Sequence, residues 1–264
     1  MSNYIISIII IYFFFGFFLF VFQRKIIFNV SGSPKKPSEY GLKDIREINV
    51  ITSDKFKLLC WYSKPNNKNL PTLIYFHGNS FDIGERAYRI KRYIDHGWGV
   101  LLVSWRGFSG NRGKPTESNL YIDAESIMNW IDKENFIKND DIVLYGESLG
   151  AGVAIEMAIR YTFKSVVLEA PFTSIVDIAQ KKYKIYPAKF LVLDKFDNLS
   201  KIKKINSPLL IISGKKDEIV PHSHSVKLYN AANKPKDSLF VDDAMHNNLY
   251  DFNIEKKVID FNKS

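Results

Sequence analysis

The chain has 264 residues, of which 46% are hydrophobic and 25% charged, which allows one sizeable domain or at most two small ones and excludes a disordered chain. A single cysteine, Cys60, excludes an internal disulfide framework, and its apolar neighbours indicate a buried, inert thiol. The formal net charge of +9 comes from scattered lysines, which indicates a solvated surface or attraction to anionic lipid. No nucleic-acid-binding motif is visible, so we expect no nucleic-acid partner.

The first segment is predicted to be a membrane anchor. From Tyr4 to Phe22 there is no charged residue, and about 20 apolar residues span a bilayer as a helix. A cleaved signal peptide would have a basic start, a shorter core and a small-residue cleavage site, and a core helix would not be apolar all round. Arg24 and Lys25 follow the run and no basic residue precedes it, which favours a cytoplasmic C-terminal domain. We therefore predict a single-pass anchor over residues 1–25, with membrane lipid as a partner.

Ser, Gly and Pro follow the anchor, so we predict a linker over residues 26–44 and a folded domain over 45–264. Two alternating segments predict a hairpin, and six nearly continuous apolar runs are typical of buried parallel strands. The eight expected strands are Glu47–Thr52, Leu58–Tyr62, Thr72–Phe76, Val100–Ser104, Asp141–Tyr145, Ser165–Leu168, Leu209–Ile212 and Ser238–Val241. The expected helices are Glu85–His96, Asn119–Asp132, Gly150–Tyr161 and Ser223–Ala232. The order predicts an α/β fold with a mostly parallel eight-stranded sheet flanked by helices, and chemistry at the carboxyl ends of the strands.

The third strand runs into a turn, His77-Gly78-Asn79, that could bind a substrate oxygen. The glycine permits close approach, and the N–H of Asn79 would form an oxyanion hole with the N–H of Leu149. We interpret His77 as a structural residue of this turn rather than a base.

A nucleophile motif follows the fifth strand. Gly146-Glu147-Ser148-Leu149-Gly150 is a G-x-S-x-G sequence between a predicted strand and a small-residue helix. The serine would sit on a strained turn, and side chains two residues away on either side would collide with the neighbouring strand or helix. This context favours Ser148 as nucleophile over a simple helix N-cap.

A serine hydroxyl needs a base, and this motif takes its partners in the order Ser, then Asp or Glu, then His. His246 follows the last strand and is the predicted base, while His222 and His224 begin a helix. Asp217 follows the seventh strand and is the predicted acid, with Glu218, Asp242 and Asp243 as alternatives. His222, His224 and Asp217 would make only a sparse metal site, and we expect no metal or organic cofactor.

Together these motifs resemble the membrane-anchored α/β-hydrolase-domain family of serine hydrolases. The matching stretches cover roughly residues 45–255 and are Tyr75–Asn79, Trp105–Gly110, Gly146–Gly150, Gly214–Pro221 and His246. The resemblance implies an α/β-hydrolase fold, the triad Ser148, Asp217 and His246, and acylated lipids or S-palmitoylated proteins as substrate classes. Family members often carry a second glycine after the His-Gly-Asn turn, where this chain has Phe81, so Phe81 is expected to narrow or line the acyl pocket.

The segment from 172 to 206 lies where such folds insert a lid, and it mixes aromatic residues with lysines. It is either an amphipathic cap over an acyl site or a surface helix that closes the domain. The predicted function is membrane-anchored hydrolysis of an acyl ester or thioester through an acyl-enzyme. A serine peptidase, an acyltransferase, a catalytically dead membrane-tethered binding module and a cationic adaptor for anionic lipid or nucleic acid remain alternatives.

Overall fold

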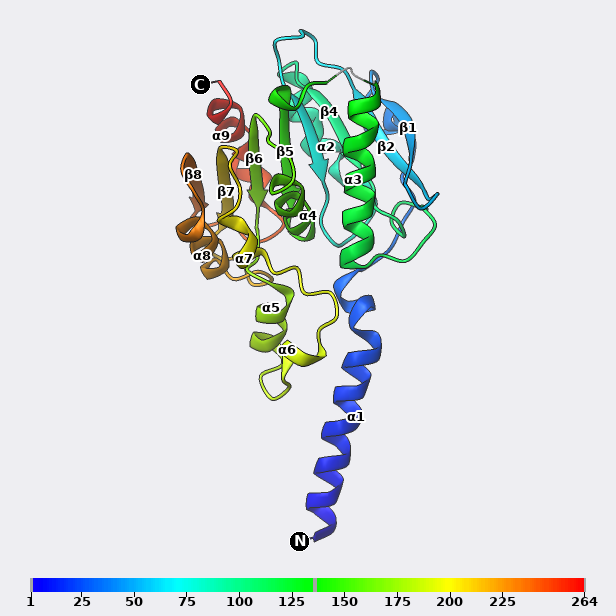
Figure 1. The fold of residues 1–264 in the computed structure, drawn as a ribbon, viewed down its shortest axis with the longest axis vertical. Helices are drawn as coiled ribbons and strands as arrows, with labels where there is room; N and C mark the ends of the chain where they lie inside the picture. The colour runs from blue at the N-terminus through cyan, green and yellow to red at the C-terminus, as the bar shows by residue number, and fades with distance from the viewer. Residues whose placement is uncertain (1, 135–136, 264) are drawn as a thin grey trace.

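An eight-stranded sheet forms the centre of the computed structural model, which describes residues 2–134 and 137–263 (Figure 1). The strand order is β1-β2-β4-β3-β5-β6-β7-β8, and all neighbours from β4 to β8 are parallel. β1 and β2 form the predicted antiparallel hairpin at one edge. The strands are β1 Arg46–Ile51, β2 Lys57–Ser63, β3 Thr72–Phe76, β4 Gly99–Val103, β5 Ile142–Glu147, β6 Ser165–Glu169, β7 Leu209–Gly214 and β8 Lys236–Val241. The predicted mostly parallel α/β sheet is confirmed.

Helices cover both faces of the sheet, because the central strands are apolar on both sides. α2 (Ala87–Asp95) and α9 (Ile254–Phe261) pack on one face, where Ile90 and Val258 are fully buried. α3 (Glu117–Glu134), α4 (Leu149–Ala158) and α8 (Ser223–Ala231) pack on the other, where Ile127 and Leu228 are fully buried. Each face therefore has its own apolar core.

The helix expected over Glu85–His96 begins later than predicted. Asp82 accepts a hydrogen bond from the Gly84 N–H and caps a short 3₁₀ helix, Ile83–Arg86, and α2 starts only at Ala87. Three further 3₁₀ helices are Pro37–Tyr40, Asn139–Asp141 and Leu249–Phe252.

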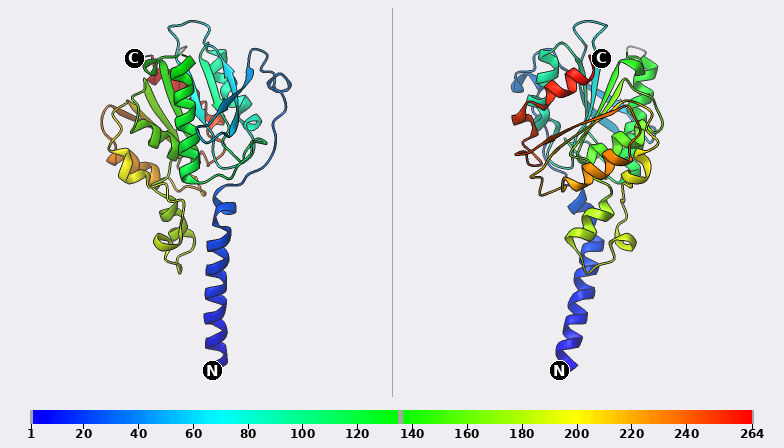
Figure 2. Two further views of the ribbon diagram at one scale, coloured as in Figure 1. Left: turned by 45° about the vertical axis from the view of Figure 1, so that its right-hand side comes forward. Right: turned by 90° about the vertical axis from the view of Figure 1, so that its left-hand side faces the viewer.

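The N-terminal helix α1 (Ser2–Ile27) projects away from the domain as a stalk (Figures 1 and 2). Within it, the most apolar 18-residue window of Tyr4–Ile27 has a mean hydropathy of 2.9 and is not buried against the rest of the protein. α1 is therefore long and apolar enough to cross a membrane, and its exposure distinguishes it from the buried core helices of the domain.

Residues 172–206, here named the cap, join β6 to β7. The cap contains α5 (Ile175–Lys182), α6 (Ala188–Leu191) and α7 (Asn198–Ile202). α7 packs on α4 and α8, whereas α5 and α6 lie beside the upper part of α1 (Figures 1 and 2). Between α1 and β1, Phe28 and Leu42 are buried and Asn29 forms a β-bridge with Ser80.

Candidate active site

Ser148 sits on a strained turn between β5 and α4. Its backbone has φ 50° and ψ −112°, a conformation that non-glycine residues rarely adopt. A β-carbon on Gly146 would lie 2.6 Å from the Ala151 Cα, and one on Gly150 would lie 2.1 Å from the Phe76 carbonyl oxygen. Both glycines of the G-x-S-x-G motif are therefore required by the close approach of backbone, as the motif predicts.

Three of the predicted site residues lie in one hydrogen-bonded chain. His246 Nε2 is 3.1 Å from Ser148 Oγ, and His246 Nδ1 is 2.7 Å from Asp217 Oδ2. The other carboxylate oxygen of Asp217 accepts hydrogen bonds from the N–H groups of Ile219 and Val220. The Asp217 side chain is fully buried, so its orientation toward the imidazole is fixed by its neighbours. This arrangement lets the imidazole accept the serine proton while the carboxylate fixes the tautomer.

A close contact between two loops brings His246 over the sheet edge. A β-carbon on Gly214 would lie 2.1 Å from the Ala244 carbonyl oxygen, so only glycine fits there. The Lys216 N–H donates to the same carbonyl at 3.0 Å. The end of β7, which leads to Asp217, is therefore joined directly to the loop that carries His246.

The alternative acids and bases are occupied elsewhere. Asp242 and Asp243 are exposed and form ion pairs with Lys215 and Lys216. Glu218 lines the pocket described below and makes no hydrogen bond to His246 among the described residues.

Neither of the other two late histidines joins the chain. The His222 Nδ1 is 2.9 Å from the Ser213 hydroxyl, and the His224 Nδ1 is 2.7 Å from the Thr173 hydroxyl. Within residues 2–134 and 137–263, no group of three or more His, Cys, Asp or Glu side chains is arranged to hold a metal ion.

His77 is unsuited to act as a base. It is fully buried, packs against Trp105 and Phe108, and its Nδ1 is 2.7 Å from the Gly78 carbonyl oxygen. Burial, together with the nearby Arg86 guanidinium, lowers the pKa of His77 to about 3, so the ring stays neutral. It serves the turn structurally, as the sequence indicates.

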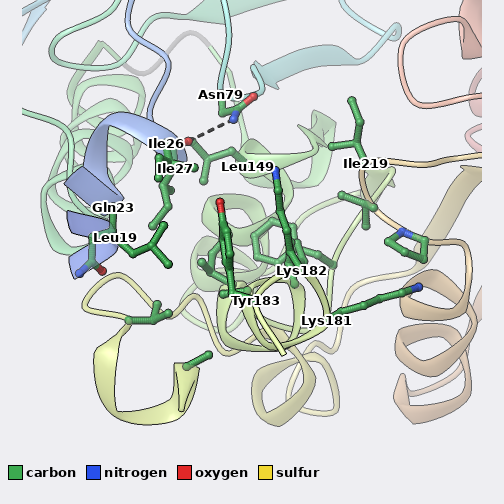
Figure 3. A pocket seen from close by; sticks show the side chains of 18 of the residues that line it. Leu19, Gln23, Ile26, Ile27, Asn79, Leu149, Lys181, Lys182, Tyr183 and Ile219 are labelled. Carbon is green, nitrogen blue, oxygen red and sulfur yellow. Dashed lines mark hydrogen bonds between the residues drawn. The ribbon is translucent and has the colours of Figure 1, made fainter. Parts of the chain in front are cut away.

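The two predicted oxyanion donors, Asn79 and Leu149, both line the cavity beside Ser148. Among the described residues, neither backbone N–H donates a hydrogen bond to a protein acceptor, which leaves both available to a substrate oxygen. The Asn79 side chain donates to the Ile27 carbonyl oxygen at the end of α1, at 3.1 Å (Figure 3). The expected role of Phe81 in the pocket is wrong: its backbone has φ 63° and its side chain is 57% exposed, outside the pocket lining.

A buried ionic network that sequence reasoning missed lies directly under the serine. The Glu147 carboxylate accepts two hydrogen bonds from the Arg86 guanidinium, at 2.8 and 3.0 Å, and one from Tyr75. Burial raises the pKa of Glu147, but Arg86 and Arg89 outweigh burial and hold that pKa well below its usual range. Arg86 also donates to the Ser80 carbonyl oxygen at 2.7 Å. One guanidinium thus links the oxyanion turn to the residue that precedes the nucleophile.

A second arginine extends the network toward the base. Arg89 is 3.2 Å from the Glu169 carboxylate and 3.5 Å from the Asn247 carbonyl oxygen, next to His246. The Glu169 backbone carbonyl in turn accepts from the Ser148 N–H at 2.8 Å. The sequence signal for this network was a Glu inside the nucleophile motif together with Arg86 and Arg89 in the helix expected over Glu85–His96.

A largely apolar cavity of about 760 Å³ opens at Ser148 (Figure 3). Its walls come from three places: the end of α1, the cap, and the loop after Asp217. Sequence reasoning missed the contribution of α1, which consists of Leu19, Phe20, Gln23, Ile26 and Ile27. The cap contributes Phe172, Ile175, Ile178, Ala179, Lys181, Lys182, Tyr183, Tyr186, Ala188, Leu191 and Val192. A cavity of this size and lining suits a mainly apolar ligand.

The fold and this site define a hydrolase of the α/β type, and comparisons with known proteins agree. The prolyl oligopeptidase family matches residues 106–248. An uncharacterized protein of Mycobacterium tuberculosis is 32% identical over 235 residues, which are 88% of this chain and 84% of that protein. The human alpha/beta hydrolase domain-containing protein 17B is 32% identical over 202 residues, or 75% of this chain and 68% of the relative.

Solved structures share the fold. An esterase of Pyrococcus furiosus superimposes with a TM-score of 0.71 at 21% identity and covers 89% of this chain and 95% of its own. The chain belongs to the α/β-hydrolase-domain family, within the group described as the prolyl oligopeptidase family. The resemblance drawn from the sequence motifs is confirmed at this level.

Proposed function

We propose that the protein is a membrane-anchored serine hydrolase that cleaves an acyl ester or thioester, of a lipid or an acylated protein, through an acyl-enzyme. The observation that carries the proposal is the chain of hydrogen bonds from Ser148 through His246 to Asp217, at 3.1 and 2.7 Å, at the mouth of an apolar cavity. The relatives described as esterases are consistent with an ester substrate.

The mechanism follows from the positions of these groups. Ser148 Oγ attacks the acyl carbonyl carbon while His246 Nε2 takes its proton. The N–H groups of Asn79 and Leu149 stabilise the resulting oxyanion. Collapse of this intermediate expels the alcohol or thiol, which takes the proton from His246. Water then attacks the acyl-enzyme with His246 as base, which releases the acid and restores Ser148.

Membrane attachment is the second part of the proposal. Residues 1–25 are the anchor, 26–44 connect it, and 45–264 form the hydrolase domain with the cap near 172–206. The apolar, unburied surface of α1 supports an anchor, and Arg24 and Lys25 at its C-terminal end support a domain on the cytoplasmic side. Membrane lipid is thus a partner, and no nucleic-acid partner is proposed.

The test is a fluorophosphonate probe applied to membranes that contain the full-length protein. We expect wild type to be labelled and Ser148→Ala to remain unlabelled, because only an activated serine reacts. Ser53→Ala is the matched control, since Ser53 is an exposed turn residue outside the cavity. A folded wild type that resists the probe would favour the dead binding module instead.

Peptide hydrolysis is the second candidate, favoured by the match to the prolyl oligopeptidase family over residues 106–248. The same triad would cleave an amide. Turnover of a prolyl-peptide amide faster than that of any ester, by wild type but not Ser148→Ala, would replace the esterase proposal.

A further inference from the structure

The upper half of α1 is joined to the cap by specific polar contacts. The Gln23 side chain donates to the Leu191 carbonyl oxygen and accepts from the Leu193 N–H, at 3.1 and 2.8 Å. The next residue toward the domain, Arg24, forms a 2.8 Å ion pair with the buried Asp194. These contacts fix the cap against one face of the helix.

The contacts continue down α1 to Tyr12. The Tyr12 ring stacks on the Tyr186 ring, with centroids 4.7 Å apart. The Tyr12 hydroxyl donates to the Ile185 carbonyl oxygen, and the Tyr186 hydroxyl donates to the Tyr12 carbonyl oxygen. Gly16 allows the Tyr186 ring to pack closely against α1, because a β-carbon at position 16 would lie 2.8 Å from that ring.

These contacts determine the depth of the cap relative to a bilayer. Arg24 is the first charged residue after the apolar run and marks its end on the domain side. Tyr12 lies twelve residues before Arg24, which is about 18 Å at 1.5 Å per residue. The hydrocarbon layer is about 30 Å thick. If α1 crosses it, the part of the cap that contacts Tyr12 must lie inside the leaflet.

The lower turn of the cap is built for such a place. Gln180 donates to the Lys184 carbonyl oxygen and accepts from the Ala188 N–H, so side-chain and backbone polar groups satisfy one another inside the turn. Ile185 and Phe190 are 70% and 80% exposed there. Exposed lysines with long apolar stems lie in the same segment, and they are Lys181, Lys182, Lys184 and Lys189.

We propose, on the basis of the serine hydrolase function above, that the substrate is a long acyl chain held in the membrane. The chain enters the cavity sideways from the leaflet, between α1 and the cap. The membrane helix is then one wall of the acyl site as well as an anchor. The substrate carbonyl reaches Ser148 while the acyl chain lies along the five α1 residues that line the cavity. The first and last of them, Leu19 and Ile27, are about 12 Å apart along the helix axis.

The test compares two p-nitrophenyl esters with full-length protein in phosphatidylcholine nanodiscs. The palmitate is embedded in the bilayer and needs the α1 wall, whereas the butyrate is soluble and short. Leu19→Trp fills the far end of the cavity and should lower kcat/KM for the palmitate about tenfold while it changes the butyrate less than about twofold. Val21→Trp is the matched control, because Val21 lies on the opposite face of α1, outside the cavity.

The outcomes separate this proposal from the one on which it rests. Unchanged palmitate turnover in Leu19→Trp, with both esters hydrolysed by wild type, overturns the α1 wall alone. An equal loss for Val21→Trp overturns it too. Absence of turnover of both esters by wild type refutes the hydrolase function itself.

A second measurement tests the cap position without any substrate. Phe190→Cys carries a nitroxide label, and Cys60 stays unlabelled because it is fully buried. We expect the label to be more accessible to oxygen than to a water-soluble nickel chelate in the nanodisc. A label at Ser53→Cys should show the reverse. Preferential access of nickel at position 190 would place the cap outside the leaflet and overturn the proposal.

Discussion

Two regions meet at Ser148, one made of buried charged residues and the other of apolar residues. Beneath the serine, a network of buried charges joins Glu147, Arg86, Arg89 and Glu169, with bonds to the oxyanion turn and to the loop next to His246. In front of the serine, the cavity is made of aliphatic and aromatic side chains from α1 and the cap. Charge-assisted hydrogen bonds allow only a small range of distances and angles, whereas apolar side chains can repack around ligands of different shape.

In the proposed function the two regions have different roles, which are catalysis and acyl-chain binding. The charged region holds the groups that act on the carbonyl, which every acyl substrate shares. The apolar region contacts only the acyl chain, which differs between substrates. Substitutions in the first should therefore affect short and long esters equally, and substitutions in the second should affect long esters selectively.

The largest expected effect is that of Asp217→Asn. The amide would still accept from the Ile219 and Val220 N–H groups but would favour the wrong tautomer of His246. We expect kcat to fall about 10⁴-fold for both the butyrate and the palmitate, with little change in thermal stability. Steady-state kinetics and thermal unfolding check this. A loss confined to the palmitate would contradict these roles.

Arg86→Met should come next, because it leaves the buried Glu147 without its main partner. We expect a loss of about 3 kcal/mol in the free energy of unfolding, measured by urea denaturation. Both esters should lose turnover together, since the bond from Arg86 to the Ser80 carbonyl also disappears. The double variant Arg86→Met/Glu147→Gln should regain part of the stability. A double variant less stable than the single one would show that the ion pair is not the cause.

Asn79→Ala tests the hydrogen bond from the oxyanion turn to α1. The variant keeps its backbone N–H but loses the bond to the Ile27 carbonyl oxygen, together with the acceptor of the Ser80 hydroxyl. We expect kcat for the butyrate to fall about fivefold, although this short ester does not reach the far α1 wall. An unchanged butyrate rate, measured in nanodiscs, would mean that the anchor does not help to position the turn.

The smallest expected effect is a dependence on pH. The folded-state pKa of Glu147 is held below its unfolded value of about 4.3, so its contribution to stability is present above that pH and is lost as pH falls toward the folded pKa. Wild type should therefore exceed Glu147→Gln in stability at pH 7, and the difference should shrink below about pH 5. Urea unfolding at pH 7 and pH 4 measures it. A constant difference would show that folding leaves the pKa of Glu147 unchanged, and a difference that grows toward pH 4 would show that the carboxyl is neutral in the folded protein.

The sequence was sufficient for the strands and for naming Ser148, Asp217 and His246 as residues that lie together. Continuous apolar runs are local signals, and the strict geometry of the Gly146–Gly150 turn leaves few alternatives. The phase of α2 was harder to predict. The aromatic residue Tyr88 is 48% exposed, while the charged residue Arg89 beside it is buried. Its burial depends on carboxylates from β5 and β6, which lie about 60 to 80 residues away.

The part that α1 plays in the cavity wall was also beyond the sequence. An apolar run looks the same whether lipid or a cavity lies beside it, and the contacts of Gln23 with the cap span 168 and 170 residues. Gln23 itself was the available signal, because a polar amide at the end of an apolar run needs partners.

The bond between Asn79 and Ile27 has a practical consequence for inhibitor discovery. Hydrolases with a membrane helix are commonly shortened to give a soluble protein for screening. Here a cut before Asn29 would delete five residues of the cavity wall together with the Ile27 carbonyl oxygen that accepts from the Asn79 side chain. Compounds selected on that fragment would be fitted to a wider, open groove, and their ranking would not transfer to the full-length enzyme.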